Sequence, residues 1–149
     1  MNKITPFLWF DNNLEEAITF YTSVFKNAQV VNIHRQTPDG PAFTATFELE
    51  GQRFMGLNGG PMFKFTEAVS FFVHCKDQEE IDYFWESLTA DGGEESMCGW
   101  LKDKYGLSWQ IVPASLEQLL YHEDPEKSAR AMQALLKMRK LDIATLQNA

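Results

Sequence analysis

Residues 6–24, PFLWFDNNLEEAITFYTSV, and residues 70–88, SFFVHCKDQEEIDYFWESL, are two copies of one pattern. They align without a gap at a constant difference in numbering (70 − 6 = 64). In each copy an aromatic-rich segment precedes apolar residues at helical spacing, which predicts a strand followed by a helix. Asn13 and Asp77 stand at the expected N-cap positions, each with a glutamate three residues later. The chain therefore contains an internal repeat.

The segments after the two helices also correspond. Further strands are predicted over residues 29–36, 42–49 and 52–57 in the first copy and over residues 96–103 and 107–112 in the second. Gly51 and Gly106 each precede the last strand, and counting from them aligns Met55 with Gln110. The pattern is βαβββ twice, which predicts an α+β fold of two tandem modules.

The C-terminal residues 114–149 predict helices instead of strands. A short helix ends before Asp124-Pro125, and a longer helix follows. Its apolar stripe packs either on the same domain or on a dimer partner, and it consists of Ala129, Met132, Leu135, Leu136, Ile143 and Leu146.

Composition excludes several classes of partner. The 149 residues are 44% hydrophobic, with a net charge of −8 and a pI of about 4.8, so we expect no nucleic acid and no membrane as partners. No apolar run approaches the roughly 20 residues of a membrane span, and no signal peptide is evident. With only two cysteines, Cys75 and Cys98, we expect a reduced, cytoplasmic protein.

Four segments together resemble the PhnB-like family, which is often labelled 3-demethylubiquinone methyltransferase-like. They are residues 4–25, 65–88, 92–113 and 131–143. The family belongs to the vicinal oxygen chelate superfamily of glyoxalases, bleomycin-resistance proteins and dioxygenases. The resemblance implies one glyoxalase-like domain over residues 1–149, in which two half-sheets form a cup. Its parts are module one at about 1–58, a linker at 59–68, module two at about 69–113 and C-terminal helices at 114–149. It also implies a homodimer.

In metal-dependent members of that superfamily, the first and last strands of each module supply the metal ligands. The resemblance places these positions on Pro6, Met55, Ser70 and Gln110. A proline, a thioether, a hydroxyl and an amide do not suit a divalent cation, so we expect the metal site to be lost and no cofactor to be required. Binding of a metal through unaligned carboxylates such as Glu48 or Glu95 stays an alternative.

Side chains alternate along a strand, so residues two apart share a face. If Pro6 and Ser70 face the cup, the predicted ligand-binding residues are Leu8, Phe10, Met55, Ser70, Phe72, His74, Trp100 and Gln110. Such a floor is apolar with a few polar groups, as in many small-molecule sites. Two alternatives stay open: the side chains line a pocket or fill a core, and the Gln110 amide bonds a ligand or another part of the protein.

These residues favour a metal-free protein that binds an unidentified small molecule. The alternative is an enzyme of the lyase, isomerase or oxygenase type, metal-dependent or using His74 as a base or Cys98 as a nucleophile. Against this, an ordinary packing role is the more usual one for a histidine or a cysteine in such positions. The methyltransferase label is disfavoured because no glycine-rich strand–loop–helix segment is present, and the glycines at 59 and 60 suit a linker.

Overall fold

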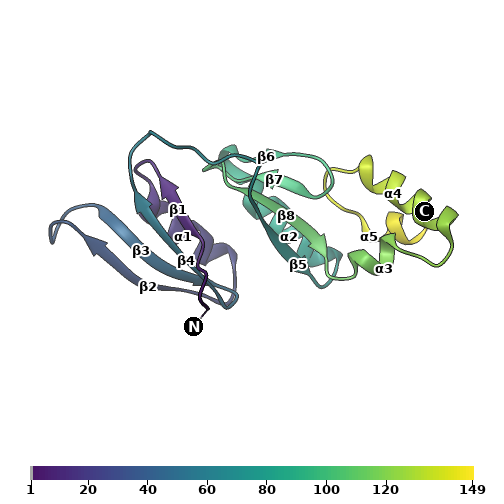
Figure 1. Ribbon diagram of the computed structural model, residues 1–149, viewed down its shortest axis with the longest axis horizontal. Helices are drawn as coiled ribbons and strands as arrows, with labels where there is room; N and C mark the ends of the chain where they lie inside the picture. Colours follow the sequence, from purple (N-terminus) through teal and green to yellow (C-terminus); the bar gives the residue numbers. More distant parts are fainter. Residues whose placement is uncertain (1) are drawn as a thin grey trace. The chain divides into compact units, whose positions relative to one another are not determined.

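The computed structural model describes residues 2–149, which form two compact units, Met1–Phe65 and Thr66–Ala149 (Figure 1). Each unit has its own four-stranded sheet, of order β1-β4-β3-β2 in the first and β5-β8-β7-β6 in the second. In both sheets the first strand runs parallel to the last, and the remaining pairs are antiparallel. The predicted α+β fold of two tandem βαβββ modules is confirmed. Within residues 2–149, no helix is long and apolar enough to cross a membrane.

The elements follow the predicted order with two corrections: the strand predicted over residues 96–103 is replaced by two short strands with a turn between them, and the longer C-terminal helix is two helices. The first unit contains β1 (Phe7–Phe10), α1 (Leu14–Val24), β2 (Ala28–Arg35), β3 (Ala42–Leu49) and β4 (Gln52–Asn58). The second contains β5 (Ser70–Cys75), α2 (Gln78–Thr89), the short 3-10 helix η1 (Ala90–Gly92), β6 (Glu94–Glu95), β7 (Trp100–Lys102) and β8 (Ser108–Pro113). It ends with α3 (Leu116–Leu120), α4 (Pro125–Leu136) and α5 (Ile143–Gln147).

In each unit one helix covers one face of the sheet. The buried side of α1, including Ile18 and Tyr21, packs on Phe47 of β3, whose ring stacks on that of Phe54. In the second unit α2 packs on β7 and β8, and the buried residues there are Ile81, Trp85, Leu88, Leu101, Trp109 and Ile111. We call the face that the helix leaves uncovered the open face of each sheet.

The two units are not related by one constant difference in numbering. The buried helix positions keep the difference of 64, as in Tyr21 and Trp85 (85 − 21 = 64). The strands do not, because Phe7 lies beside Met55 whereas Phe72 lies beside Gln110 (72 − 7 = 65). The cause is the connection from strand to helix, which has three residues (11–13) in the first unit and two (76–77) in the second.

This shift reverses the expected orientation of β1. Leu8 and Phe10 face α1 and are only 6% and 2% exposed, while Phe7 and Trp9 lie on the open face. The ring of Phe10 and the side chain of Leu14 both lie over Gly56 on the helix side. The prediction that Leu8 and Phe10 face the cup is therefore wrong. The ungapped alignment missed one inserted residue.

The two helix N-caps also differ. The Asp77 carboxylate accepts a hydrogen bond from the Glu80 backbone N–H at 2.9 Å, as predicted. Asn13 does occupy the N-cap position of α1, as predicted, but its side chain makes no capping bond. Instead, Asn58 of β4 accepts from the Leu14 N–H at 2.9 Å. A neighbouring strand thus supplies the acceptor that the sequence assigned to Asn13.

The C-terminal helices pack on the second unit itself. Their buried side chains form a cluster with Val112 of β8, and its other members are Leu119, Leu120, Ala131, Leu135, Leu141 and Leu146. The predicted stripe is partly wrong, since Ala129 is exposed and Leu136 is 58% exposed. Gln78 of α2 fixes the segment through bonds of 2.9 Å to the Leu141 carbonyl and the Ile143 N–H.

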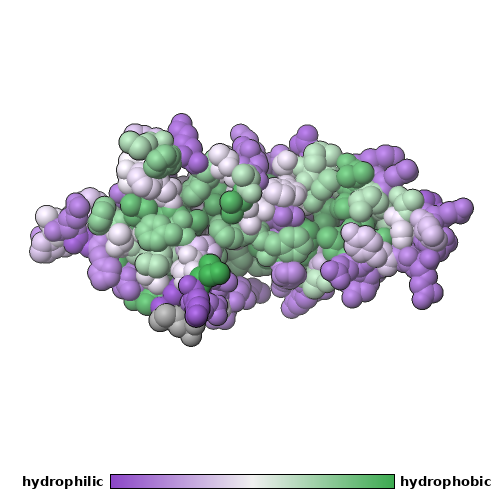
Figure 2. Space-filling view, in the orientation of Figure 1, coloured by the Kyte–Doolittle hydropathy of each residue, from purple (hydrophilic) through white to green (hydrophobic). Residues whose placement is uncertain are grey.

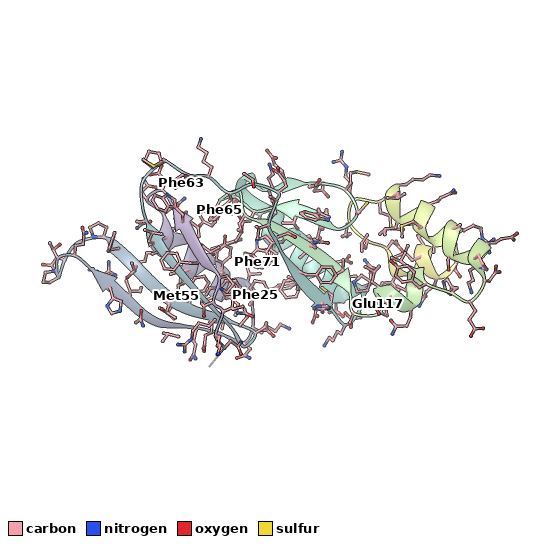
Figure 3. All side chains as sticks on the ribbon, in the orientation of Figure 1. Phe25, Met55, Phe63, Phe65, Phe71 and Glu117 are labelled. Atoms are coloured by element: carbon pink, nitrogen blue, oxygen red, sulfur yellow. The ribbon has the colours of Figure 1, made fainter. Side chains whose placement is uncertain are left out.

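The glycine-rich segment after β4 folds back over Trp9. The Trp9 indole donates to the Gly60 carbonyl at 2.9 Å, and its ring lies 5.0 Å from that of Phe63 (Figure 3). A side chain at Gly59 would meet the Trp9 ring at 2.5 Å, so only glycine fits there. The glycines thus serve the packing of the first unit.

Candidate functional site on the open face of the second sheet

Five predicted site residues share the open face of the second sheet. Ser70, Phe72 and His74 alternate along β5, Gln110 lies on β8, and Trp100 lies on β7. The register places Trp100 opposite Gln110 and Gln110 beside Phe72. An amide therefore lies between two aromatic side chains in one row across three strands. We call Trp100, Gln110 and Phe72 the aromatic row.

The aromatic row is accessible. The Phe72 side chain is 44% exposed, and the Trp100 and Gln110 side chains are partly exposed. The exposed His74 ring extends the row along β5, with its centroid 4.8 Å from that of Phe72. The open face at this point is a flat, largely apolar surface with one amide, which resembles the floor of a small-molecule site.

The Gln110 amide has a partner inside the protein. Its Nε2 donates to the Ser70 hydroxyl at 2.9 Å. Its Oε1 accepts no hydrogen bond from residues 2–149, and the Ser70 O–H still has its own proton to donate. The two alternatives for Gln110 are therefore compatible, because one end bonds within the sheet and the other can receive a ligand.

The neighbouring row is polar. The register places Lys102 opposite Ser108 and Ser108 beside Ser70. The Ser108 hydroxyl is buried, with the residue 1% exposed, and it has no hydrogen-bond partner within the described chain. A buried hydroxyl without a hydrogen-bond partner lowers the free energy of unfolding by about 1–3 kcal/mol. Ser108 is therefore an unsatisfied donor and acceptor. We call Lys102, Ser108 and Ser70 the polar row.

The charges of the polar row are compensated. Lys102 forms an ion pair with Glu67, and the register places Glu94 of β6 opposite it. The hydrogen bond to Lys102 lowers the pKa of Glu67, and the bond to Glu67, with the charge of Glu94 as a smaller cause, raises the pKa of Lys102. One cation thus faces two carboxylates, and no positive charge remains for an anionic ligand.

The sequence reasoning did not include Ser108 and Lys102 among the binding residues. Alternation from Gln110 reaches Ser108, and alternation from Trp100 reaches Lys102. Strand alternation could therefore have placed both residues on the open face. The register between β7 and β8, which aligns the two residues in one row, could not be predicted from the sequence.

The open face of the first sheet carries Met55. Met55 is exposed and lies beside Phe7, and Leu57 lies beside Trp9. Figure 2 shows hydrophobic side chains, in green, over the part of the first unit visible from this side, and Figure 3 labels Met55 there. Leu8 and Phe10 belong to the core on the other side of this sheet and are not available on the open face.

The first unit also has a polar cavity of about 380 Å³. Its lining consists of Asn2, Thr5, Glu48, Gly51 and Arg53, of which only Glu48 was named from the sequence, as an alternative metal ligand. The Arg53 guanidinium bonds one oxygen of Glu48 at 3.1 Å, and Gln29 bonds the other at 2.7 Å. These two bonds, that of Gln29 first, lower the pKa of Glu48.

The residues present do not fit a divalent metal ion. The difference of 65 between the strands moves the position that matches Ser70 from Pro6 to Thr5 (70 − 65 = 5), which is again a neutral residue. Across the described part of the chain, no three His, Cys, Asp or Glu side chains are grouped as metal ligands would be. Glu48 is bound as described above, and Glu95 accepts from the Trp85 indole at 2.6 Å. Neither carboxylate is a free ligand.

The weak catalytic candidates have no catalytic surroundings. No hydrogen bond within residues 2–149 orients the His74 ring, and a general base needs such a partner. Cys98 packs against the C-terminal cluster, with its backbone N–H bonded to the Met138 carbonyl at 2.8 Å. Cys75 is fully buried, and burial, with the nearby charges of Glu80 and Asp77, raises the pKa of its thiol to about 12.

A family model described as 3-demethylubiquinone-9 3-methyltransferase matches residues 2–112. A solved structure described with the same activity, the PhnB protein of Bacillus cereus, has 39% identity and a TM-score of 0.70, and the alignment covers 76% of this chain and all of that one. The chain belongs to this PhnB-like family. No curated protein matches it.

More distant structures share the fold of the PhnB-like chain. Protein PA1353 of Pseudomonas aeruginosa has 17% identity and a TM-score of 0.59 over 73% of this chain and 95% of that one. The fosfomycin resistance protein FosX of Listeria monocytogenes, solved with Mn(II) and sulfate, has 17% identity and a TM-score of 0.56 over 81% of this chain and 99% of that one. At this level of identity the likeness establishes the vicinal oxygen chelate fold and nothing of the ligand.

Proposed function

We propose that this PhnB-like protein binds a small organic molecule on the open faces of its sheets without a divalent metal ion. The observation that carries the proposal is the aromatic row, in which the half-free amide of Gln110 lies between Phe72 and Trp100. A mostly apolar and aromatic lining with a few placed polar groups is the usual composition of a small-molecule site. We further propose, from the superfamily resemblance, that the two open faces line one cup and that the protein is a homodimer.

The family description names a methyltransferase, but the chain offers no support for that activity. A site for a nucleotide methyl donor usually has a glycine-rich turn between a strand and the following helix. The two strand–helix connections here, residues 11–13 and 76–77, contain no glycine. Ligand binding therefore fits the observed side chains better than methyl transfer does.

The test is a fragment screen followed by two-dimensional NMR of the ¹⁵N-labelled protein. The fragments are small aromatic compounds of positive, negative and zero charge, each added in the presence of EDTA. We expect some of them to shift the backbone signals of residues 70–74, 100–102 and 108–112. The chelator should not reduce the shifts, because no metal takes part.

Two variants give the screen a matched control. Phe72→Ala removes an exposed wall of the site and should weaken the binding of every fragment hit. Tyr121→Ala removes an aromatic side chain of greater exposure, 69%, that lies outside the open face, and it should change nothing. A screen in which no fragment shifts the open-face signals, or in which EDTA abolishes the shifts, contradicts the proposed function.

A further inference from the structure

The open face of the second sheet carries a donor and acceptor pattern that selects among ligands. From the pattern and charges of its two rows, we infer that the preferred ligand is a neutral, flat aromatic carboxamide or lactam. This inference rests on the proposed function and specifies the chemical class of the ligand at the same site.

The spacing of the aromatic row suits one flat ring. Neighbouring strands lie about 4.8 Å apart, so Trp100 and Phe72 are separated by two spacings, about 10 Å. A ring placed over Gln110 would lie about 5 Å from each of them, within the range of about 4.5–7 Å that aromatic pairs prefer. A ring system therefore fits between the two aromatic side chains with the amide beneath it.

The hydrogen-bonding groups around this ring position favour a ligand that has both a donor and an acceptor. Gln110 Oε1 accepts no bond within residues 2–149, and it is available to a ligand N–H. The half-buried Ser70 hydroxyl has a proton to donate, whereas the Ser108 hydroxyl beside it is out of a ligand's reach. A ligand carbonyl can accept from Ser70 while the adjacent N–H donates to Gln110. Amides and lactams carry these two groups side by side.

The charges on this face select against an ionised ligand. The only cation of the two rows within the described chain is Lys102, and Glu67 and Glu94 both lie against it. A carboxylate ligand would find no unpaired cation, and it would approach a chain with a net charge of −8. A neutral head group avoids this repulsion and leaves the ion pair intact.

The experiment compares three probes that share one ring system: naphthalene-2-carboxamide, methyl naphthalene-2-carboxylate and naphthalene-2-carboxylate. Binding is measured by NMR titration of the wild-type chain, following residues 70–74, 100–102 and 108–112. We expect the carboxamide to bind at least about tenfold more tightly than the ester, which lacks the N–H donor, and than the anion.

Substitutions then test the assigned groups. Gln110→Leu should weaken carboxamide binding about tenfold and leave the ester almost unaffected, because only the carboxamide has an N–H, and Ser108→Ala, at a hydroxyl that a ligand does not reach, should change neither affinity. Ser108→Ala should also keep or raise the melting temperature of the free protein, because it removes an unpaired hydroxyl. The control Gln133→Leu makes the same change as Gln110→Leu at an exposed position on α4 and should alter neither affinity.

Three outcomes would overturn the inference: equal affinities for the three probes, tightest binding of the carboxylate, or a Gln110→Leu variant that binds the carboxamide as the wild type does. If the probes fail while other fragments shift the open-face signals, the inference is wrong and the proposed function stands. If no fragment binds to this face, the proposed function itself fails.

Discussion

Single residues decide what the open face can recognise. Gln110 offers an amide that is half satisfied by Ser70. A neutral amide cannot balance the charge of a divalent cation, but it presents a donor and an acceptor suited to a neutral ligand. Under the proposed function, this side chain is a recognition group and not a metal ligand.

The two cysteines should differ in reactivity. Cys75 is fully buried and its thiol pKa is raised to about 12, so it is protonated and shielded at neutral pH. Cys98 is partly exposed. We expect iodoacetamide at pH 8 to alkylate Cys98 alone in the folded protein, and both residues after unfolding. Peptide mass mapping measures this, and modification of Cys75 in the folded chain would contradict the packing of β5 against α2.

The same thiol predicts a loss of stability in alkali. A raised pKa in the folded state means that the folded chain holds the proton more tightly than the unfolded chain does. The associated stability is complete below the ordinary thiol pKa of 9.0 and is lost as the pH rises toward about 12. Cys75→Ala should therefore flatten the decline of the melting temperature above pH 9 relative to Cys98→Ala, and equal declines in the two variants would argue against this assignment.

At the scale of elements, the start of α1 depends on a neighbouring strand. Asn58 accepts from the Leu14 N–H and donates to the Ala42 carbonyl at 2.8 Å, so it joins α1, β3 and β4. We expect Asn58→Ala to lower the free energy of unfolding by about 2 kcal/mol, because both bonds are lost. The matched control Asn13→Ala should cost less than about 0.5 kcal/mol, since its side chain makes no cap bond.

Urea unfolding followed by circular dichroism measures both variants. The reverse order, with Asn13→Ala more costly than Asn58→Ala, would mean that α1 begins with the cap that the sequence suggested.

The C-terminal helices lie beyond residue 112, where the match to the family ends. Gln78 connects them to α2 through two backbone bonds, and Lys140 adds an ion pair with Asp82 at 2.9 Å. Gln78→Ala should lower the free energy of unfolding by about 2 kcal/mol and increase hydrogen exchange in α5. If exchange in α5 is unchanged, other contacts hold the segment and this anchor is unimportant.

The order of elements was predictable because each strand and helix has its own periodicity. The second module was predicted well, since Ser70, Phe72, His74, Trp100 and Gln110 do share a face. The first strand was not, because one residue inserted before α1 reverses a strand without changing any apolar pattern. Apolar residues such as Leu8 and Phe10 suit either a core or the floor of a cup, so only the register of the strand distinguishes these two arrangements.

At the scale of the whole molecule, ion pairs make stability depend on acid. Hydrogen bonds from neighbouring side chains lower the pKa values of four carboxylates. Arg35 bonds Glu15, Gln29 and Arg53 bond Glu48, Lys102 bonds Glu67, and Lys140 bonds Asp82. Each lowered pKa adds to the free energy of unfolding. This contribution is complete above the ordinary pKa values, 4.5 for Glu and 3.8 for Asp, and it is lost as the pH falls through and below them.

We therefore expect a melting temperature that is flat near neutral pH and falls in acid below about pH 5. The pairs are exposed, so each contributes little and high salt should reduce the acid dependence. Differential scanning calorimetry at low and high salt measures this. A melting temperature that rises in acid would show that repulsion among the excess carboxylates outweighs these pairs.

The most direct test of the account is the metal content of the whole protein. Tag-free protein is incubated with Mn, Fe, Ni and Zn, desalted and subjected to elemental analysis. Since the aligned positions Thr5, Met55, Ser70 and Gln110 are all neutral, retained metal should stay below about one-tenth of an equivalent. Retention of one equivalent of any of these metals would contradict the proposal of metal-free binding.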